Sequence, residues 1–357
     1  MKKIVGLALC LVLVFTMLVS CDEQNIGDGI GHYPETQQTV ERLDLNMYII
    51  TGDESAKAAT DAVATRISGY TKITYNTVLN ITYLTESEYE EAVVNAINAG
   101  GNKAPHIVLI NSESLFDKLM EGNKLADLTS YYWSRDYGRL NTQITSSLIE
   151  KSYVGDKIYT VPNNRVVGEY TYLAINKDVA MKTLKYTNSE LSSYKSLEDA
   201  AALMAEMDAN GFNSADYVKI VKGPYELRET LEVENFCNIV EVPTVTRADA
   251  FASAFAVVNN SQQKYNDRAM NLIYAINNDL ELRNFLQYGV VGANFELVDG
   301  DIVRIKTGNS VYDMDLTYTG DTFKADNCSE LGWTDAKKGY GILQNKDSKV
   351  EAEVEAE

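Results

Sequence analysis

From residue 43 to residue 122 the chain alternates between apolar runs that suit buried strands and amphipathic stretches that suit helices. The first run, Leu43–Ile50, is almost continuously apolar, as expected for a strand covered on both faces of a parallel sheet. Further strands are predicted at 79–83 and 107–110, and each of the three strands is followed by a helix. A capping-box pattern at Ser87 and Glu90 marks the second helix. Three strand–helix pairs in succession predict a doubly wound α/β sheet with right-handed crossovers.

The remainder of the chain continues the mixed pattern less regularly. Residues 125–149 are mixed and helical, and Ser196 begins a capping-box pattern ahead of another helix. Strands are predicted at 158–162, 170–175, 236–242 and 255–258, and helical faces at 269–276 and 282–286. Residues 295–323 are predicted to form β-hairpins, with turns at Asp299-Gly300 and at Thr319-Gly320-Asp321.

The first 21 residues form a secretory leader pattern. Lys2 and Lys3 precede an apolar run of about 16 residues, which is shorter than the roughly 20 needed to span a bilayer, so a simple transmembrane anchor is the weaker interpretation. The run ends in Leu-Val-Ser-Cys, which resembles the lipobox of bacterial lipoproteins. The resemblance implies removal of residues 1–20, addition of a diacylglycerol to Cys21, and a protein lipid-anchored on the extracytoplasmic face of the cell membrane. Residues 21–40 are then the lipidated cysteine and a flexible tether.

Composition limits the kinds of partner. The formal charge of the chain is −19, and loss of Lys2 and Lys3 takes it to −21. So acidic a protein is not suited to nucleic acid or to docking on anionic headgroups. Hydrophobic residues make up 45% and charged residues 23% of the chain, an ordinary globular composition, and the length after the leader fits two domains.

Cysteine usage leaves one alternative open. Cys10 leaves with the leader and Cys21 takes the lipid, so Cys237 and Cys328 remain. In an oxidising compartment these two either pair in a disulfide or stay as separate buried thiols, because spacing in the sequence does not show proximity.

The chain lacks the residues of most catalytic sites. His32 lies in the tether and His106 begins a buried strand, where a structural role is the better interpretation. No nucleophile elbow, zinc-ligand spacing or phosphate loop is present, and no cofactor or metal is expected. The 51 acidic residues allow almost any pair of carboxylates, so a glycosidase stays as an alternative without a specific signal.

Four segments in order carry a resemblance to a known family. They are Ala104–Ile110 (APHIVLI), Gly122–Leu128 (GNKLADL), Gly155–Pro162 (GDKIYTVP) and Tyr172–Asp178 (YLAINKD). Together with the helix in 267–289, this order resembles the family 1 extracellular solute-binding proteins of ABC importers, over most of residues 43–290. His106 stands where that family usually has aspartate, and the stretch between Tyr172 and Phe255 is short for the family.

The resemblance implies a two-domain α/β architecture of the periplasmic-binding-protein type (type II), with a ligand cleft between the domains and crossing hinge strands. On this basis the first domain comprises residues 41–162 and about 255–295. The second comprises about 163–254 and about 296–346, and an acidic tail at 347–357 is expected to be disordered.

Candidate ligand residues come from the strand ends, the crossover and the aromatic side chains. Ligands of open α/β sheets bind outside the carboxyl ends of strands, which singles out Thr51, Asp53, Asn111 and Ser112. Asn163 and Arg165 lie at the predicted crossover, where Arg165 is either a fork for ligand oxygens or a surface ion pair. The chain has 23 tyrosines, and aromatic faces stack on sugar rings. We therefore include Trp133, Tyr170, Tyr225 and Trp333, although core packing is the more common role for each taken singly.

The resemblance implies a binding protein without enzymatic activity. Its expected partners are a small polar solute and the membrane subunits of an ABC permease, and it is expected to be a monomer. Sugars or oligosaccharides are the favoured solutes, with peptides, polyamines and other small polar solutes as alternatives. A lipoprotein that presents its ligand to a sensor kinase is the other non-catalytic hypothesis.

Overall fold

The computed structural model describes residues 41–137, 140–223, 227–298, 302–328 and 349–350. The leader, Cys21, the tether and two candidate ligand residues, Tyr225 and Trp333, lie outside these ranges, so the expectations for them stay predictions. Within the described ranges, none of the helices combines the length and the apolar character that a membrane crossing requires.

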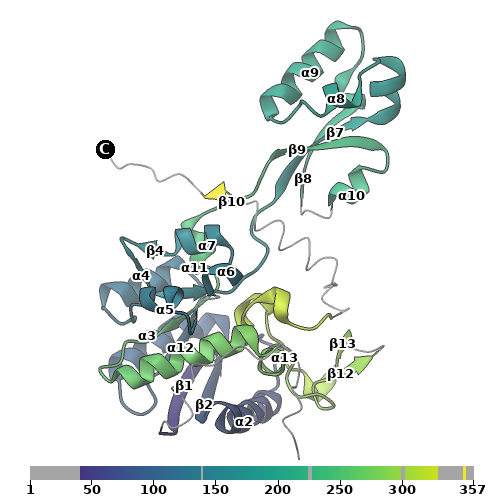
Figure 1. The fold of residues 1–357 in the computed structure, drawn as a ribbon. Coiled ribbons are helices and arrows are strands. Elements are labelled where there is room, and N and C mark those ends of the chain that lie inside the picture. The colour runs from purple at the N-terminus through teal and green to yellow at the C-terminus, as the bar shows by residue number, and fades with distance from the viewer. Residues whose placement is uncertain (1–40, 138–139, 224–226, 299–301, 329–348, 351–357) are drawn as a thin grey trace, which may run out of the picture. The chain divides into compact units, whose positions relative to one another are not determined.

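The larger of the two main sheets has five strands in the order β2-β1-β3-β11-β6 (Figure 1). β1 is parallel to both of its neighbours, whereas β11 runs antiparallel to β3 and to β6. The predicted α/β class is confirmed, and every strand predicted between residues 43 and 110 is present. The bounds are β1 Leu43–Ile50, β2 Thr77–Leu84, β3 Ile107–Ile110, β6 Thr160–Pro162 and β11 Ala254–Val257.

Helices join and cover these strands. In Figure 1, α12 runs in front of the sheet, where it contacts β1 and β11, and α13 packs on α12 and α2. The start predicted for the second helix was two residues late. Thr85 is the N-cap, because β2 ends at Leu84 and the helix begins directly after it. The Thr85 hydroxyl donates to the Glu88 carboxylate. The bounds are α2 Lys57–Thr74, α3 Glu86–Ala99, α4 Glu113–Glu121, α12 Gln263–Asn278 and α13 Leu280–Tyr288.

The strand predicted at 158–162 is divided in two. Ile158 pairs with Tyr153 in a small hairpin that turns at Gly155, and only β6 enters the main sheet. The short elements around it include the helices predicted within 125–149. They are α5 Thr129–Trp133, α6 Leu140–Gln143, α7 Ser146–Lys151, β4 Tyr153–Val154, β5 Lys157–Ile158, β10 Thr244–Val245 and α11 Arg247–Phe251.

A second sheet has three antiparallel strands in the order β8-β7-β9. β8 was not predicted from the sequence, because Lys219 and Lys222 interrupt its apolar residues and both are exposed. Ser196 caps α9 by accepting a hydrogen bond from the backbone N–H of Asp199, as its pattern predicted. The bounds are β7 Tyr170–Asn176, a π-helical turn Val179–Thr183, α8 Asn188–Leu191, α9 Leu197–Ala209, a 3₁₀ turn Ser214–Asp216, β8 Val218–Gly223, α10 Leu227–Leu231 and β9 Asn235–Glu241.

The stretch 295–323 differs from the prediction in its second half. β12 (Phe295–Val298) and β13 (Ile302–Ile305) form the first predicted hairpin, whose turn lies outside the described residues. No second hairpin follows in the described residues after β13. Residues 310–323, which we call the strap, instead contain 3₁₀ turns at Leu316–Thr319 and from Thr322 onward.

Buried side chains of α12 and α13 explain why the strap is not a strand. Arg283 is fully buried and donates to the carbonyl oxygens of Asp321 and Leu316, both at 3.1 Å, and to the Thr319 hydroxyl at 2.6 Å. Asn277 accepts from the backbone N–H of Asp321 at 2.8 Å. These side chains satisfy backbone groups that a hairpin would pair with a neighbouring strand.

Separate apolar clusters underlie these parts. The largest lies between the main sheet and its helices, and another joins β7 and α9.

Cys237 and Cys328 are buried in two further clusters, so the structure has separate thiols and not a disulfide. The predicted domain boundaries stay a prediction. Strap residues contact α12 and α13 and the segment after β6, and Cys328 packs with residues of α13, β12 and β13. Lys349–Val350 (β14), placed by the sequence in a disordered tail, pairs with β10.

Candidate ligand site at the carboxyl edge of the main sheet

The topology places a switch point between β1 and β3. β2 lies on the far side of β1, so the connections that leave β1 and β3 run to opposite sides of this point. Ligands of open α/β sheets bind in the crevice outside the carboxyl ends of the strands at such a switch point. The predicted residues Thr51 and Asp53 follow β1, and Asn111 and Ser112 follow β3, so the two pairs flank it.

The two strands separate before they reach this edge. They pair only at Met47 with Ile107 and at Tyr48 with Val108. Beyond that point the buried Tyr89 hydroxyl bridges them, donating to the Tyr48 carbonyl oxygen at 2.9 Å and accepting from the backbone N–H of Leu109 at 2.7 Å. A side chain from α3 therefore replaces the strand pairing where the carboxyl ends diverge.

The edge continues along the antiparallel strand and β6. Ala254, the first residue of β11, is opposite both Ile110 and Pro162. Asn111, Ser253 and Asn163 consequently occupy adjacent positions along one edge. With strands about 4.8 Å apart, the backbones of Asn111 and Asn163 are about 10 Å apart.

Two buried amide oxygens at this edge have no hydrogen-bond partner among the described residues. The Nδ2 group of Asn163 donates to the Ser253 hydroxyl and to the Thr317 carbonyl oxygen, both at 3.0 Å. Because a carbonyl oxygen only accepts, this contact fixes the orientation of the amide and turns its Oδ1 away, where it is buried and unpartnered, as is Oδ1 of Asn111. Each such oxygen costs about 1–3 kcal/mol, which a donor group on a ligand would recover.

Of the other predicted strand-end residues, Thr51 and Ser112 have structural contacts and Asp53 is exposed. The hydroxyls of Thr51 and Ser55 both reach the carbonyl oxygen of Asp313, at 3.1 and 3.0 Å, and hold the strap against the end of β1. Ser112 caps α4 by accepting from the backbone N–H of Leu115 at 3.1 Å. The sequence placed these residues correctly at the strand ends, and their roles toward a ligand stay predictions.

Arg165 is held differently from either interpretation of the sequence. The residue is nine-tenths buried, and its guanidinium donates to the backbone carbonyl oxygens of Asn163, Ser253 and Asp249. Burial lowers the pKa of Arg165, while the nearby Asp249 carboxylate opposes that effect. The described contacts make Arg165 a link between the segment after β6 and the turn before β11, rather than an open fork or a surface ion pair.

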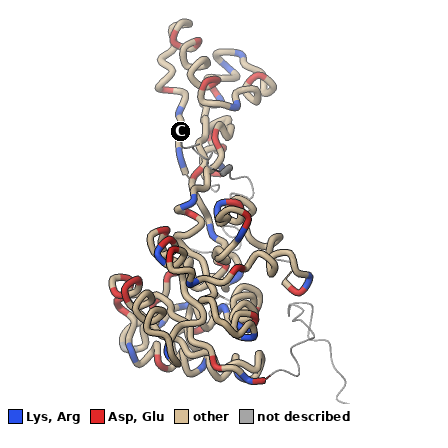
Figure 2. The backbone as a smooth tube through the Cα atoms, turned by 90° about the vertical axis from the view of Figure 1, so that its left-hand side faces the viewer, with Lys and Arg blue, Asp and Glu red and all other residues tan. Residues whose placement is uncertain are grey.

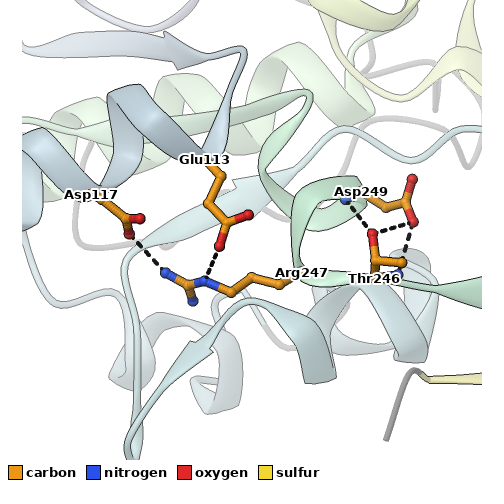
Figure 3. A network of polar contacts seen from close by, with 5 residues as sticks. All are labelled: Glu113, Asp117, Thr246, Arg247 and Asp249. Carbon is orange, nitrogen blue, oxygen red and sulfur yellow. Dashed lines mark hydrogen bonds and ion pairs between the residues drawn. The ribbon is translucent and has the colours of Figure 1, made fainter. Parts of the chain in front are cut away.

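A polar network joins α4, which follows β3, to α11, which precedes β11 (Figure 3). Arg247 on α11 donates to Glu113 at 2.6 Å and to Asp117 at 2.9 Å, both on α4. Thr246 and Asp249 form a capping box at the start of α11. α4 begins directly after Asn111 and Ser112, and α11 ends just before Ser253, so this network couples both sides of the edge.

Of the predicted aromatic residues, the two that the structure describes, Trp133 and Tyr170, do not lie at this edge. Trp133 is 61% exposed on α5, and its neighbour Tyr132 bonds the Thr160 carbonyl oxygen at the opposite end of β6. Tyr170 is fully buried in β7 and stacks on Tyr172, so its ring packs in a core and has no free face.

The structure adds residues that the sequence did not suggest. Ser253 and Thr317 position Asn163, and Tyr318 presents a half-buried ring from the strap. The Tyr318 hydroxyl lies 3.5 Å from the Glu86 carboxylate, and burial together with that charge raises the pKa of the phenol. No local pattern identifies these residues, because the strap reaches the edge only through its packing on α12 and α13.

A separate surface pocket of about 430 Å³ lies between α3 and α4, and none of the candidate residues lines it. Its lining is Ser87, Glu90, Glu91, Val94, Asn95 and Lys118.

No family model and no curated protein sequence matches the chain. Solved structures do match. The N-glycan transport solute binding protein of Streptococcus pneumoniae, in complex with Man1GlcNAc, is 17% identical over 86% of this chain and 84% of its own, with a TM-score of 0.54. Its complex with Man5GlcNAc gives 17% identity, 86% and 83% coverage, and a TM-score of 0.54.

A third match is an extracellular solute-binding protein family 1 from Alicyclobacillus acidocaldarius, at 11% identity, 88% coverage of both chains and a TM-score of 0.45. At these identities the likeness concerns architecture alone, and it rests on the Streptococcus protein. The chain therefore has the fold of an extracellular solute-binding protein, as the resemblance of its sequence implied.

Proposed function

We propose that this protein is a lipid-anchored, extracytoplasmic solute-binding protein of an ABC importer. In this proposal it captures a carbohydrate without chemical turnover and delivers it to a membrane permease. The fold supports the binding role, and the Streptococcus protein with that fold carries glycans in its structures. The lipobox-like sequence before Cys21 supports the anchor.

The observation that carries the carbohydrate assignment is the pair of unpartnered amide oxygens, on Asn111 and Asn163. Binding sites for small solutes combine a few well-placed polar groups with apolar or aromatic surface. Sugar hydroxyls are donors that match the two oxygens, and the half-buried ring of Tyr318 offers a face for the C–H side of a sugar ring.

Access to the first oxygen requires little rearrangement. Asn111 is only half-buried as a residue, and its side chain makes no hydrogen bond within the described structure. Rotation about its side-chain bonds therefore exposes the oxygen without breaking a described hydrogen bond. Asn163 is tied to Ser253 and Thr317, so its oxygen is a fixed acceptor.

Capture by hinge closure is consistent with the connectivity. The chain passes between the two sheets twice, through residues 163–169 and again through 242–253. Two linking segments of this kind form a natural hinge, and a ligand favours closure only through contacts that it makes in the closed state.

The experiment is calorimetric binding of neutral oligosaccharides to the purified protein and to Asn111→Ala. The variant removes an amide that supports nothing else in the described structure. We expect at least a tenfold weaker Kd, which corresponds to about 1.4 kcal/mol, with no loss of melting temperature in the free protein. Asn95→Ala is the matched control, since Asn95 is exposed on α3 and lines the separate pocket.

Unchanged affinity in Asn111→Ala would overturn the site. A loss confined to Asn95→Ala would move it to the pocket between α3 and α4. Release of reducing sugar during the titration would favour the glycosidase alternative.

A further inference from the structure

We infer that this site selects neutral or positively charged glycans and excludes acidic ones. The inference rests on the proposed function and adds the charge class of the ligand to it. It follows from two independent features of the edge, a set of uncompensated carboxylates and the two amide oxygens that require a donor.

Exposed carboxylates surround the strand ends. Asp53 follows β1, and Glu86 follows β2 within 3.5 Å of the Tyr318 hydroxyl. Asp313 is held beside the end of β1, because its carbonyl oxygen accepts from the backbone N–H of Gly52 at 2.8 Å. Asp315 lies two residues further along the strap and caps its 3₁₀ turn. Asp and Glu, interspersed with Lys and Arg, also occur on elements throughout the described chain (Figure 2), and in the whole sequence 51 acidic residues face 32 basic ones.

Three described cations on the elements that meet at this edge, Arg165, Arg247 and Lys57, are already engaged. The Arg165 guanidinium is buried and bonded to backbone carbonyl oxygens. Arg247 pairs with two carboxylates of α4, and Lys57, at the start of α2, pairs with Asp61 at 2.9 Å. An anionic ligand at this edge would therefore meet net negative charge.

The amide oxygens act in the same direction for a different reason. Oδ1 of Asn163 belongs to a fully buried side chain and has no described partner, so it requires a hydrogen-bond donor. Hydroxyl and ammonium groups donate, whereas an ionised carboxylate only accepts. A uronic or sialic acid group at this position would leave the oxygen unpaired and add like-charge repulsion.

The test compares glycans that share a backbone and differ in charge. The neutral probes are mannobiose, cellobiose and chitobiose. The acidic probes are the same disaccharides oxidised to the uronic acid at C6, and the cationic probe is deacetylated chitobiose. Kd is measured calorimetrically at about 0.01 M and about 1 M salt, where the Debye length is about 30 and about 3 Å.

For a neutral disaccharide that binds, we expect its acidic counterpart to bind at least tenfold more weakly at low salt. That ratio should shrink at high salt, because screening removes the repulsion but leaves the unpaired oxygen. We expect deacetylated chitobiose to bind at least as tightly as chitobiose.

Variants then assign the discrimination to the edge. Neutralising three carboxylates should bring the acidic probe to within about threefold of the neutral one at low salt. The substitutions are Asp53→Asn, Glu86→Gln and Asp313→Asn, made together; each keeps the shape of the side chain.

The matched control removes the same number of charges at positions away from the carboxyl edge of the main sheet. It combines Asp44→Asn at the start of β1, Glu121→Gln at the end of α4 and Asp156→Asn in the turn before β5, all exposed positions. The control should keep the discrimination of the parent.

Equal or tighter binding of the acidic probes would overturn the inference while leaving carbohydrate binding in place. Loss of discrimination in the control as well would show that it comes from overall charge and would overturn the assignment to this edge. Absence of binding to every neutral and cationic glycan would overturn the proposed function, and the inference with it.

Discussion

Asp321 makes the stability of this protein sensitive to pH in an unusual direction. Its carboxyl lies in the strap, is 4% exposed, and accepts a hydrogen bond from the backbone N–H of Phe323 at 2.9 Å. Burial raises the pKa of Asp321 from its ordinary 3.8 to about 6, although that hydrogen bond and the charges of Lys324 and Arg283 act against the shift. The folded state therefore favours the protonated acid.

The sign follows from proton linkage. Because the folded state holds this proton more tightly than the unfolded chain, the contribution of Asp321 to stability is greatest below about pH 4 and is lost as pH rises through about 6. A change from 3.8 to about 6 corresponds to about 3 kcal/mol in total. About 2 kcal/mol of that loss falls between about pH 4.5 and about pH 7.5.

Asp321→Asn removes the ionisation and keeps the shape. We subtract the unfolding free energy of the parent from that of the variant at each pH. This difference should rise by about 2 kcal/mol from about pH 4.5 to about pH 7.5, because only the parent loses stability as Asp321 ionises. The measurement is urea unfolding of both proteins at the two pH values, with a common m-value. Taking the difference cancels the other titrating groups, including His106, whose pKa is lowered by burial.

The control is Asp313→Asn, which removes the same charge from an exposed position of the strap. It should retain the pH dependence of the parent. A difference between Asp321→Asn and the parent that does not change with pH would refute the reasoning, because it would mean that Asp321 titrates alike in the folded and unfolded chains.

Two further substitutions test the framework of the site. Tyr89→Phe removes the buried hydroxyl that bridges Tyr48 and Leu109, which leaves a backbone donor and a backbone acceptor unpaired. We expect the unfolding free energy, measured with urea, to fall by about 2–4 kcal/mol, and a loss below about 0.5 kcal/mol would contradict the bridge. Gly320→Ala places a Cβ on a residue with φ +125°, within 3.3 Å of the Arg283 side chain. We expect the unfolding free energy to fall by more than about 1 kcal/mol in the same assay, and an unchanged unfolding midpoint would contradict the tight packing of the strap.

Much of the fold was predictable because its signals are local. A continuous apolar run such as Leu43–Ile50 buries both faces of a strand wherever it lies, and a cap such as Ser196 satisfies backbone groups of its own helix. The order of four sequence segments also carried the family resemblance, and the fold of the Streptococcus protein agrees with it. β8 escaped detection because its exposed lysines obscure the strand pattern.

The strand ends of the site were equally predictable. Thr51, Asn111 and Asn163 each follow a recognisable apolar strand, and parallel strands bring their carboxyl ends to one edge. The sequence alone therefore identified the edge, the approximate polar residues on it, and the acidic character of the whole protein.

What the sequence left open depends on contacts between distant segments. Thr317, Tyr318 and Asp313 reach the edge only because the fully buried Arg283 fixes the backbone of the strap, and Tyr170 packs in a core because a second sheet forms around it. Arg165 bonds to backbone carbonyl oxygens that its own segment does not supply. Local patterns specify which groups need burial or a partner, but only the tertiary packing decides which partner each buried polar group finds.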